Sequence, residues 1–176
     1  MIFDILFPQQ HIELNEVLLH VSPRSINGVT ALLPYRNRII QKLIKRTKFG
    51  NSKESARILG AVLKQHLDSL HIPDLVIVPI PLHPIRRMVR GYNQVERIAR
   101  SSGYPVVNAL KRTKYTKAQA RLGHTERQDL VGAFELMHTV TGTVVLLDDV
   151  VTTGRTFEGA LKAMPGVPIY PLALAH

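Results

Sequence analysis

The architecture of this chain follows from one segment, Val144-Val-Leu-Leu-Asp-Asp-Val-Val-Thr-Thr-Gly-Arg-Thr156. Its opening residues, Val144 to Leu147, are all apolar, and such a run predicts a strand that is buried on both faces of a parallel sheet. We expect Asp148 and Asp149 to stand where this strand leaves the sheet, because open α/β sheets bind ligands at the carboxyl ends of their strands. A helix is predicted next, from apolar residues at helical spacing: Phe157, Ala160, Leu161 and Met164.

The residues between the acidic pair and this helix are typical of a phosphate site. They combine small hydroxyl side chains with one glycine, Gly154. A helix N-terminus offers unpaired backbone N–H groups and the positive end of a dipole, both of which suit a phosphate. Carboxylates beside it would repel that phosphate unless they face another part of the ligand. Ribose hydroxyls supply the donors that carboxylates accept, so the segment predicts a sugar-phosphate ligand.

This order of residues resembles the phosphoribosyl pyrophosphate motif of the type I phosphoribosyltransferases, and all thirteen positions fit it. The resemblance implies that Asp148 and Asp149 are catalytic residues that hold the ribose hydroxyls. It implies Mg²⁺ as cofactor, in contact with the ligand and with these two acids. The implied 5′-phosphate loop consists of Val151, Thr152, Thr153, Gly154, Arg155 and Thr156. The alternative is a buried strand with surface aspartates, followed by a capped helix.

A second motif follows another apolar run, Leu75 to Val78, which predicts a further buried strand. Pro79-Ile-Pro-Leu-His-Pro84 predicts a rigid turn, because proline fixes φ and biases the preceding residue toward extended conformations. Three arginines then precede a predicted helix that begins near Gln94. A stiff loop with guanidinium groups could hold pyrophosphate, since arginine binds phosphate oxygens in pairs. The alternative is a solvated basic surface loop.

Together, Val78-Pro-Ile-Pro-Leu82 and Arg90-Gly-Tyr-Asn-Gln94 resemble the bacterial phosphoribosyltransferase-like family named after ComF and GntX. The resemblance implies a pyrophosphate loop of Pro81, Leu82, Arg86, Arg87 and Arg90. It also implies a catalytic flexible loop that closes over the substrate, with Lys114, Thr116, Gln119, Arg121 and Arg127 in it. Asp129 departs from the asparagine that is usual in the family.

The first 34 residues fit this family only in outline. Members commonly carry a four-cysteine zinc ribbon after a Leu-Phe-Pro sequence, which is present here at Leu6-Phe7-Pro8. The cysteines are replaced by His11, Leu14, His20 and Pro23, which cannot form a structural zinc site, so no zinc is expected. We therefore predict a degenerate, hairpin-like appendage over residues 1–34 and a phosphoribosyltransferase-like domain over residues 35–176.

The remaining pattern predicts two helices and two strands. The helices are expected at residues 35–48 and from a capping box at Asn51 and Glu54 to about Leu70. The strands are expected at Val106–Leu110 and at residues 167–175. With the two strands above, they predict an α/β fold whose central, mainly parallel sheet is flanked by helices.

Composition narrows the class of protein further. The chain has 176 residues, of which 45% are hydrophobic and 20% charged, so it is long enough for a packed core. Without cysteine, and with no apolar run of transmembrane length, a cytoplasmic protein is the expectation. The net charge of +10 is concentrated between Arg36 and Arg57 and between Arg86 and Arg127. Pyrophosphate explains only part of it; solvated helix faces and nucleic-acid contact compete for the rest.

The reaction expected from these motifs is displacement of pyrophosphate from phosphoribosyl pyrophosphate by a nitrogen nucleophile. The sequence identifies neither the acceptor nor the oligomeric state. The second hypothesis is a non-catalytic, ComF-like competence protein that binds single-stranded DNA or helps to take it up, and the basic segment motivates it. A phosphorylatable receiver domain is disfavoured, because its acidic pair belongs near the first strand and the Thr/Gly loop would have no role.

Overall fold

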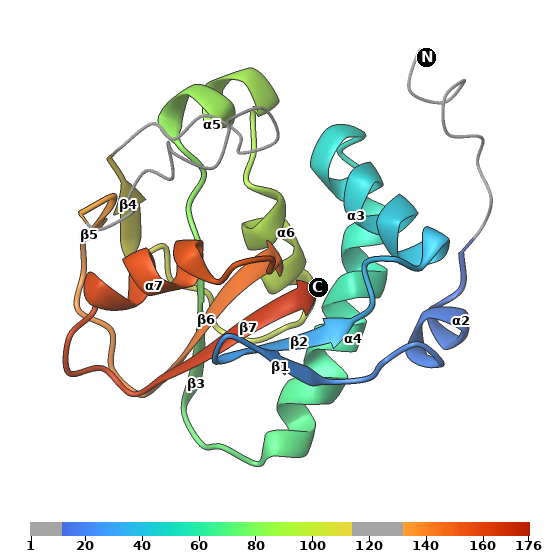
Figure 1. The fold of residues 1–176 in the computed structure, drawn as a ribbon, viewed down its shortest axis with the longest axis horizontal. Coiled ribbons are helices and arrows are strands. Elements are labelled where there is room, and N and C mark those ends of the chain that lie inside the picture. Colours follow the sequence, from blue (N-terminus) through green and yellow to red (C-terminus); the bar gives the residue numbers. More distant parts are fainter. Residues whose placement is uncertain (1–11, 114–131) are drawn as a thin grey trace.

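A computed structural model describes residues 12–113 and 132–176. The helices are α2 (Leu14–Leu18), α3 (Arg38–Phe49), α4 (Lys53–Leu70), α5 (Pro84–Arg90), α6 (Gln94–Ser101) and α7 (Arg155–Lys162). The strands are β1 (Arg24–Ile26), β2 (Val29–Leu33), β3 (Leu75–Pro79), β4 (Leu110–Arg112), β5 (Phe134–Leu136), β6 (Thr143–Val150) and β7 (Ile169–Ala175). Figure 1 shows helices on both faces of one sheet.

The central sheet has the strand order β1-β2-β7-β6-β3. Only the β1–β2 pair is antiparallel, and β2, β7, β6 and β3 run parallel to their neighbours. β6 lies inside the sheet, because Val145 is paired with Tyr170 of β7 and with Ile77 of β3. The prediction of an α/β fold with a mainly parallel central sheet is confirmed.

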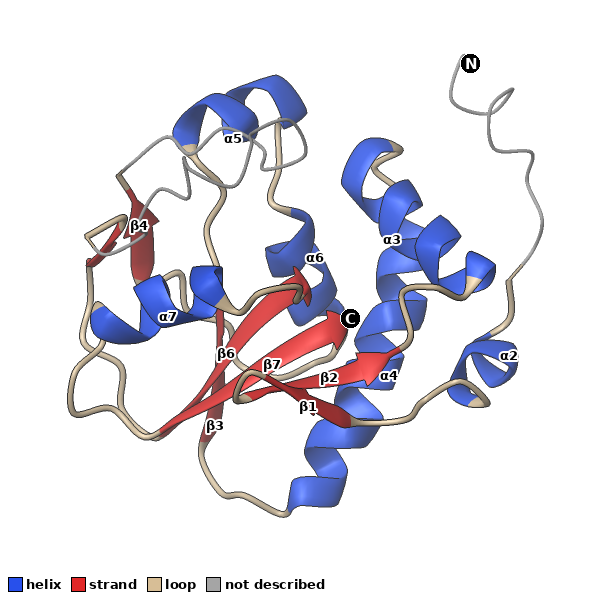
Figure 2. Cartoon of the chain, viewed as in Figure 1, coloured by secondary structure: helices blue, strands red, loops and turns tan. Residues whose placement is uncertain are grey.

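Two hydrophobic clusters cover the two faces of this sheet. Val145 and Leu147 of β6 pack into the cluster that contains the buried sides of α3, α4 and α6. Val144 and Leu146 belong to the other cluster, with Phe157 of α7 and the β4–β5 pair. Successive strand residues point to opposite faces, so an unbroken apolar run is what a strand with two covered faces requires. Figure 2 shows α7 and the group α3, α4 and α6 on their respective sides.

The N-terminal part is continuous with this sheet. β1 and β2 form a hairpin around Asn27 and Gly28, whose positive φ values of 50° and 80° suit a two-residue turn that follows the strand twist. β2 then pairs with β7 in parallel, with Ala31 opposite Ala173. The hairpin character expected for this region is present. β2 ends at Leu33, and the domain boundary at residue 34 stays a prediction.

Three local predictions need correction. The strand predicted at residues 106–110 is reduced to one bridge between Val106 and Ile77, and β4 begins only at Leu110, because it pairs with β5 outside the central sheet. The predicted arginine-bearing loop is the helix α5, which the His83 side chain caps and Pro84 begins. Helix α4 is capped by Ser52 and not by Asn51, because Asn51 takes up a left-handed conformation at φ 52°.

The other predicted helices and strands are present with small shifts at their ends. The strand expected to end at Leu147 continues to Val150, because Asp148 and Val150 still pair with β7. Asp148 and Asp149 therefore lie among the last residues of β6 and not beyond its end. No helix in the described ranges is both long enough and apolar enough to span a bilayer.

Candidate active site at the carboxyl end of β6

The acidic pair points to two sides of β6. Asp149 lies on the same face of β6 as Val145 and Leu147, the face covered by α6. It is only 6% exposed. Asp148 is more exposed and lies on the side of β4, where Arg112 acts on its charge. Its Oδ1 accepts a hydrogen bond of 2.8 Å from the backbone N–H of Asp149. The two carboxylates are thus close in the chain but have different surroundings.

Asp149 is held by side chains from two helices. The Gln94 Nε2 donates a hydrogen bond of 2.8 Å to Asp149 Oδ2. The other end of the same amide, Oε1, accepts a hydrogen bond of 2.5 Å from Arg90. Lys48, at the end of α3, places its Nζ 3.8 Å from Asp149 Oδ2. We call the group of Asp148, Asp149, Gln94, Arg90 and Lys48 the acid-pair site.

The electrostatics of Asp148 set it apart from an ordinary surface carboxylate. Burial first, and then the neighbouring charge of Asp149, raise the pKa of Asp148 to about 8. The hydrogen bond from the Asp149 backbone and the charges of Lys48 and Arg112 act in the opposite direction. Negative charge is therefore crowded at this end of β6, and a cationic group in a ligand would relieve it.

The arginines of α5 diverge. Arg90 reaches Gln94 and lies 5.5 Å from the centre of the Phe49 ring, which Lys48 also approaches at 5.9 Å. Arg86 lies near Arg112, because the pKa of Arg112 is lowered by burial first and then by the charge of Arg86. Arg87 instead acts on Glu96, on the outer face of α6. Two of the three predicted pyrophosphate arginines are thus directed to the acid-pair side.

The turn that carries Pro81 and Leu82 is tied to the sheet and to α6. The backbone N–H of Ile80 donates to Leu147 of β6 at 2.8 Å, and its carbonyl accepts a hydrogen bond of 3.1 Å from the Asn93 side chain. Asn93 is also the N-cap of α6, where its Oδ1 accepts from the N–H of Val95. This turn therefore begins beside the end of β6, with Pro81 and Leu82 half-buried.

The predicted phosphate loop follows β6 directly. Val151 is buried and its N–H donates to the Ala175 carbonyl at 2.9 Å, while Thr152 and Thr153 are exposed. Gly154 has φ 74° and is the N-cap of α7, a conformation in which other residues are strained. Arg155 and Thr156, both half-buried, open the helix. No side chain caps this helix end, so its first N–H groups face the loop.

Some residues of the site escaped the sequence analysis. In the sequence, Lys48 and Arg112 are only members of basic segments, and Gln94 is the start of a helix and the end of the Arg90–Gln94 motif, with no role of its own predicted. Asn27, in the β1–β2 turn, donates a hydrogen bond of 3.3 Å to the Thr153 carbonyl, so the N-terminal hairpin supports the phosphate loop. The predicted flexible-loop residues lie outside the described ranges: Lys114, Thr116, Gln119, Arg121 and Arg127.

The fold and the site define an α/β protein with a mostly parallel sheet flanked by helices, consistent with a phosphoribosyltransferase-like core. No family model matches the chain. It is 33% identical to Competence protein F of Haemophilus influenzae over 138 residues, covering 69% of this chain and 60% of that protein. Competence protein ComFC of Streptococcus pneumoniae is 26% identical, over 73% of this chain and 58% of the relative. Over these stretches the chain is therefore similar to proteins named as competence proteins F and ComFC.

A third relative, Competence protein ComFC of Bacillus subtilis, is 27% identical over 73% of this chain and 54% of its own length. The chain therefore spans between 54% and 60% of the length of these curated relatives. The activity of the whole relatives is for this reason a matter of proposal below.

Proposed function

We propose that this protein binds phosphoribosyl pyrophosphate and transfers its phosphoribosyl group to a nitrogen nucleophile. One observation carries the proposal. β6 ends in two carboxylates, and the next residues form a short loop that turns at a left-handed Gly154 into the uncapped N-terminus of α7. Acceptors for a sugar diol and donors for a phosphate thus follow each other along a single connection.

In this proposal the ribose 5-phosphate lies along that connection. The backbone N–H groups at residues 152–156 and the hydroxyls of Thr152, Thr153 and Thr156 bind the phosphate. Asp148 and Asp149 accept hydrogen bonds from the ribose hydroxyls. Asp149 is fixed by Gln94, so it is the better positioned of the two, whereas Asp148 is partly buried and its pKa is raised by burial and by Asp149.

Pyrophosphate is assigned to the neighbouring turn. Arg86 and Arg90 stand on the acid-pair side of α5, and their guanidinium groups can pair with phosphate oxygens. Pro81 and Leu82 belong to the turn that the Ile80 hydrogen bonds hold beside β6. Arg87 would receive pyrophosphate only from the far side of α5, because its charge acts on Glu96.

The proposed chemistry is a substitution at the anomeric carbon. The bond from this carbon to the pyrophosphate oxygen breaks, its electron pair leaves with pyrophosphate, and the nitrogen lone pair forms the new bond. The nitrogen then loses a proton to solvent or to a nearby base. Positive charge develops on the ribose ring in such a reaction, and the carboxylates of the acid-pair site stabilise it.

Mg²⁺ fits the donors at the end of β6. Its preferred ligands are oxygen atoms, and it is usually held by one or two carboxylates together with substrate phosphates. The crowding that raises the pKa of Asp148 is what a cation would relieve. Asp148 and Asp149 would hold the ion, which supplies charge neutralisation for the departing pyrophosphate.

Calorimetry with phosphoribosyl pyrophosphate tests this assignment. The variant Asp148→Asn/Asp149→Asn is expected to lose detectable binding, because both acceptors of the ribose contacts lose their charge. A matched control is Asp74→Asn/Glu135→Gln, which removes the same charge from exposed acids away from the carboxyl end of β6 and should bind as the parent does. Unchanged affinity in the first variant would refute the proposal. A screen of nucleobases and amines for pyrophosphate release would then identify the acceptor.

A second candidate function is a competence-related role in which the protein binds single-stranded DNA without catalysis. The names of the relatives and the cationic surface of α3 favour it. On α3 the pKa of Lys42 is lowered by burial first and by the charge of Arg46 second, so like charges are crowded there. Binding of an oligothymidylate that weakens steeply with salt, and that survives Asp148→Asn/Asp149→Asn, would support this role. Loss of that binding in the variant would count against it.

A further inference from the structure

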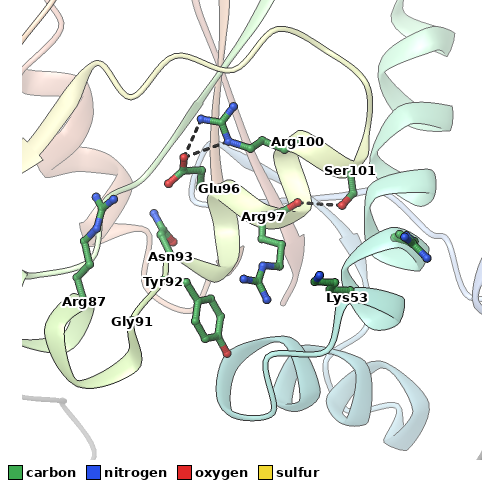
Figure 3. Close-up of a pocket in the computed structure, with 10 residues that line it drawn as sticks. Lys53, Arg87, Gly91, Tyr92, Asn93, Glu96, Arg97, Arg100 and Ser101 are labelled. Atoms are coloured by element: carbon green, nitrogen blue, oxygen red, sulfur yellow. Dashed lines mark hydrogen bonds and ion pairs between the residues drawn. The ribbon is translucent and has the colours of Figure 1, made fainter.

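A pocket lies on the other side of α6 from Gln94 and the acid-pair site. It has a volume of about 470 Å³ and is formed by the N-terminal half of α4, the segment Gly91–Asn93 and the outer face of α6 (Figure 3). The inner face of α6 is buried through Gln94, Val95, Ile98 and Ala99. Helical periodicity turns Glu96, Arg97 and Arg100 to the other side, where they line the pocket. We call this pocket the basic groove.

The charge of the basic groove is strongly positive. Its cations are Lys53 and Arg57 of α4, Arg87 of α5, and Arg97 and Arg100 of α6. Glu96 is the only acid in its lining, and it is already bound by Arg100 at 2.8 Å and by Asn108 at 3.0 Å. Burial raises the pKa of Glu96, but the hydrogen bonds from Asn108 and Arg100 lower it by more. The net pKa is therefore lowered, which favours the ionised carboxylate. One acid therefore faces five cations.

The placement of two of these cations is unfavourable for the helix itself. Lys53 is the first residue of α4, at the positive end of the helix dipole, where a cation is disfavoured. Arg57 lies four residues later, and like charges at this spacing repel each other on a helix surface. Both side chains line the basic groove and both residues are exposed. A bound anion would relieve both penalties.

The basic groove is bounded at both ends. At one end, Tyr92 donates a hydrogen bond of 2.7 Å to the Thr47 carbonyl, and Arg97 donates one of 3.1 Å to the Asn51 carbonyl, so the α3–α4 turn is joined to α6. At the other end, α4 and α6 touch at Gly60, where an added Cβ would lie 2.7 Å from the Ser101 Cβ. A bounded pocket of this size suits a compact ligand better than a polymer.

We propose that the basic groove is a second anion site that binds a compact polyphosphate, meaning two or more linked phosphate groups, free or as part of a nucleotide. Arginine pairs with phosphate oxygens through its planar fork, and Lys53 adds a point charge. The site is separate from the acid-pair site and does not depend on phosphoribosyl transfer. Single-stranded nucleic acid is the competing source of phosphate, and the experiment distinguishes it.

The test is calorimetric titration of the full chain with inorganic tripolyphosphate at low salt and without Mg²⁺. Lys53→Ala/Arg57→Ala is expected to weaken binding by about tenfold or more, since charge-assisted phosphate contacts are lost. Both residues are exposed, so the variant should melt as the parent does. The matched control Arg24→Ala/Lys64→Ala removes two exposed cations outside the groove and should bind within about twofold of the parent.

The site of binding is checked with the other variants. Asp148→Asn/Asp149→Asn should keep its affinity for tripolyphosphate, even though it loses phosphoribosyl pyrophosphate, so the two proposals can fail separately. Loss of tripolyphosphate binding in Arg86→Ala, but not in the groove variant, would overturn the inference. So would a parent protein that binds a fluorescent oligothymidylate through Lys53 and Arg57 but does not bind tripolyphosphate.

Discussion

The acid-pair site and the basic groove lie on opposite faces of the short helix α6, and they differ in how their charges are balanced. In the acid-pair site, Asp149 is buried and matched by Gln94 and Lys48. In the basic groove, cations gather around a single acid and remain largely open to solvent. The first arrangement is held in position before any ligand arrives, because burial makes an unmatched charge costly. The second can carry unmatched charge because water screens it.

The two regions also differ in what holds them together. The acid-pair site depends on single polar contacts, among which the Gln94 amide joins Arg90 to Asp149. The basic groove depends on how closely two helices pack, and Gly60 sets that separation. Substitutions can therefore disturb one region and leave the other unchanged, which gives three ways to test the contrast.

The largest effect on stability is expected from Gly60→Leu. A side chain here would collide with the backbone of Ser101, whose carbonyl carbon would lie 2.8 Å from the new Cβ, so α6 must move away from α4. We expect a loss of about 3 kcal/mol in the free energy of unfolding, measured with urea, because overpacking of this kind is costly. Tripolyphosphate binding should weaken as well. Ala61→Leu introduces the same side chain one position later, on a half-exposed site, and serves as the control.

A parent-like stability in Gly60→Leu would mean that the helices can separate freely. The basic groove would then lack the fixed width that its selectivity for a compact ligand requires.

A smaller and more local effect is expected from Gln94→Leu. The substitution leaves the buried Asp149 with Lys48 alone, at 3.8 Å, and removes the acceptor of Arg90. The free energy of unfolding should fall by about 2 kcal/mol, the usual cost of a buried acceptor without its donor. Affinity for phosphoribosyl pyrophosphate should fall, while tripolyphosphate affinity should not change. The control is Gln65→Leu on an exposed position of α4, and equal losses in both ligands would contradict the separation of the two regions.

The third effect depends on pH. Because the folded protein raises the pKa of Asp148 to about 8, the folded state holds a proton that the unfolded chain has released. The contribution of this proton to the free energy of unfolding is fully present below about pH 4, the ordinary pKa of an aspartate. It is lost as the pH rises through 8. Asp148→Asn removes it. The melting temperature of the variant, minus that of the parent, should increase between pH 5 and pH 8.5, because only the parent loses this stability.

Taking the difference between the two proteins cancels the other titrating groups, which both share. A melting-temperature difference that does not change with pH would show that Asp148 titrates normally and that the acid-pair site is not electrostatically crowded.

Much of this organisation is predictable from local pattern. The apolar run at Val144 to Leu147 indicates a doubly covered strand, and the sequence order places two acids and a glycine loop after it. The strand's extension to Val150 was not predictable, because Asp148 and Val150 are kept in the sheet by pairing with β7. The pairing of β2 with β7 was likewise not predictable, since nothing in the residues of the N-terminal hairpin indicates its partner strand.

The strand, the helix and the order of the polar residues between them follow from residues that are neighbours in the chain, so they can be predicted from local pattern. Folding is needed to bring Gln94 to Asp149, 55 residues away, and to bring Lys48 to the same carboxylate from a third element. Folding also turns Arg87 from the acid-pair site toward the basic groove. The physical reason is that such contacts depend on which faces of separate helices are buried against the sheet, a property of the packed core as a whole.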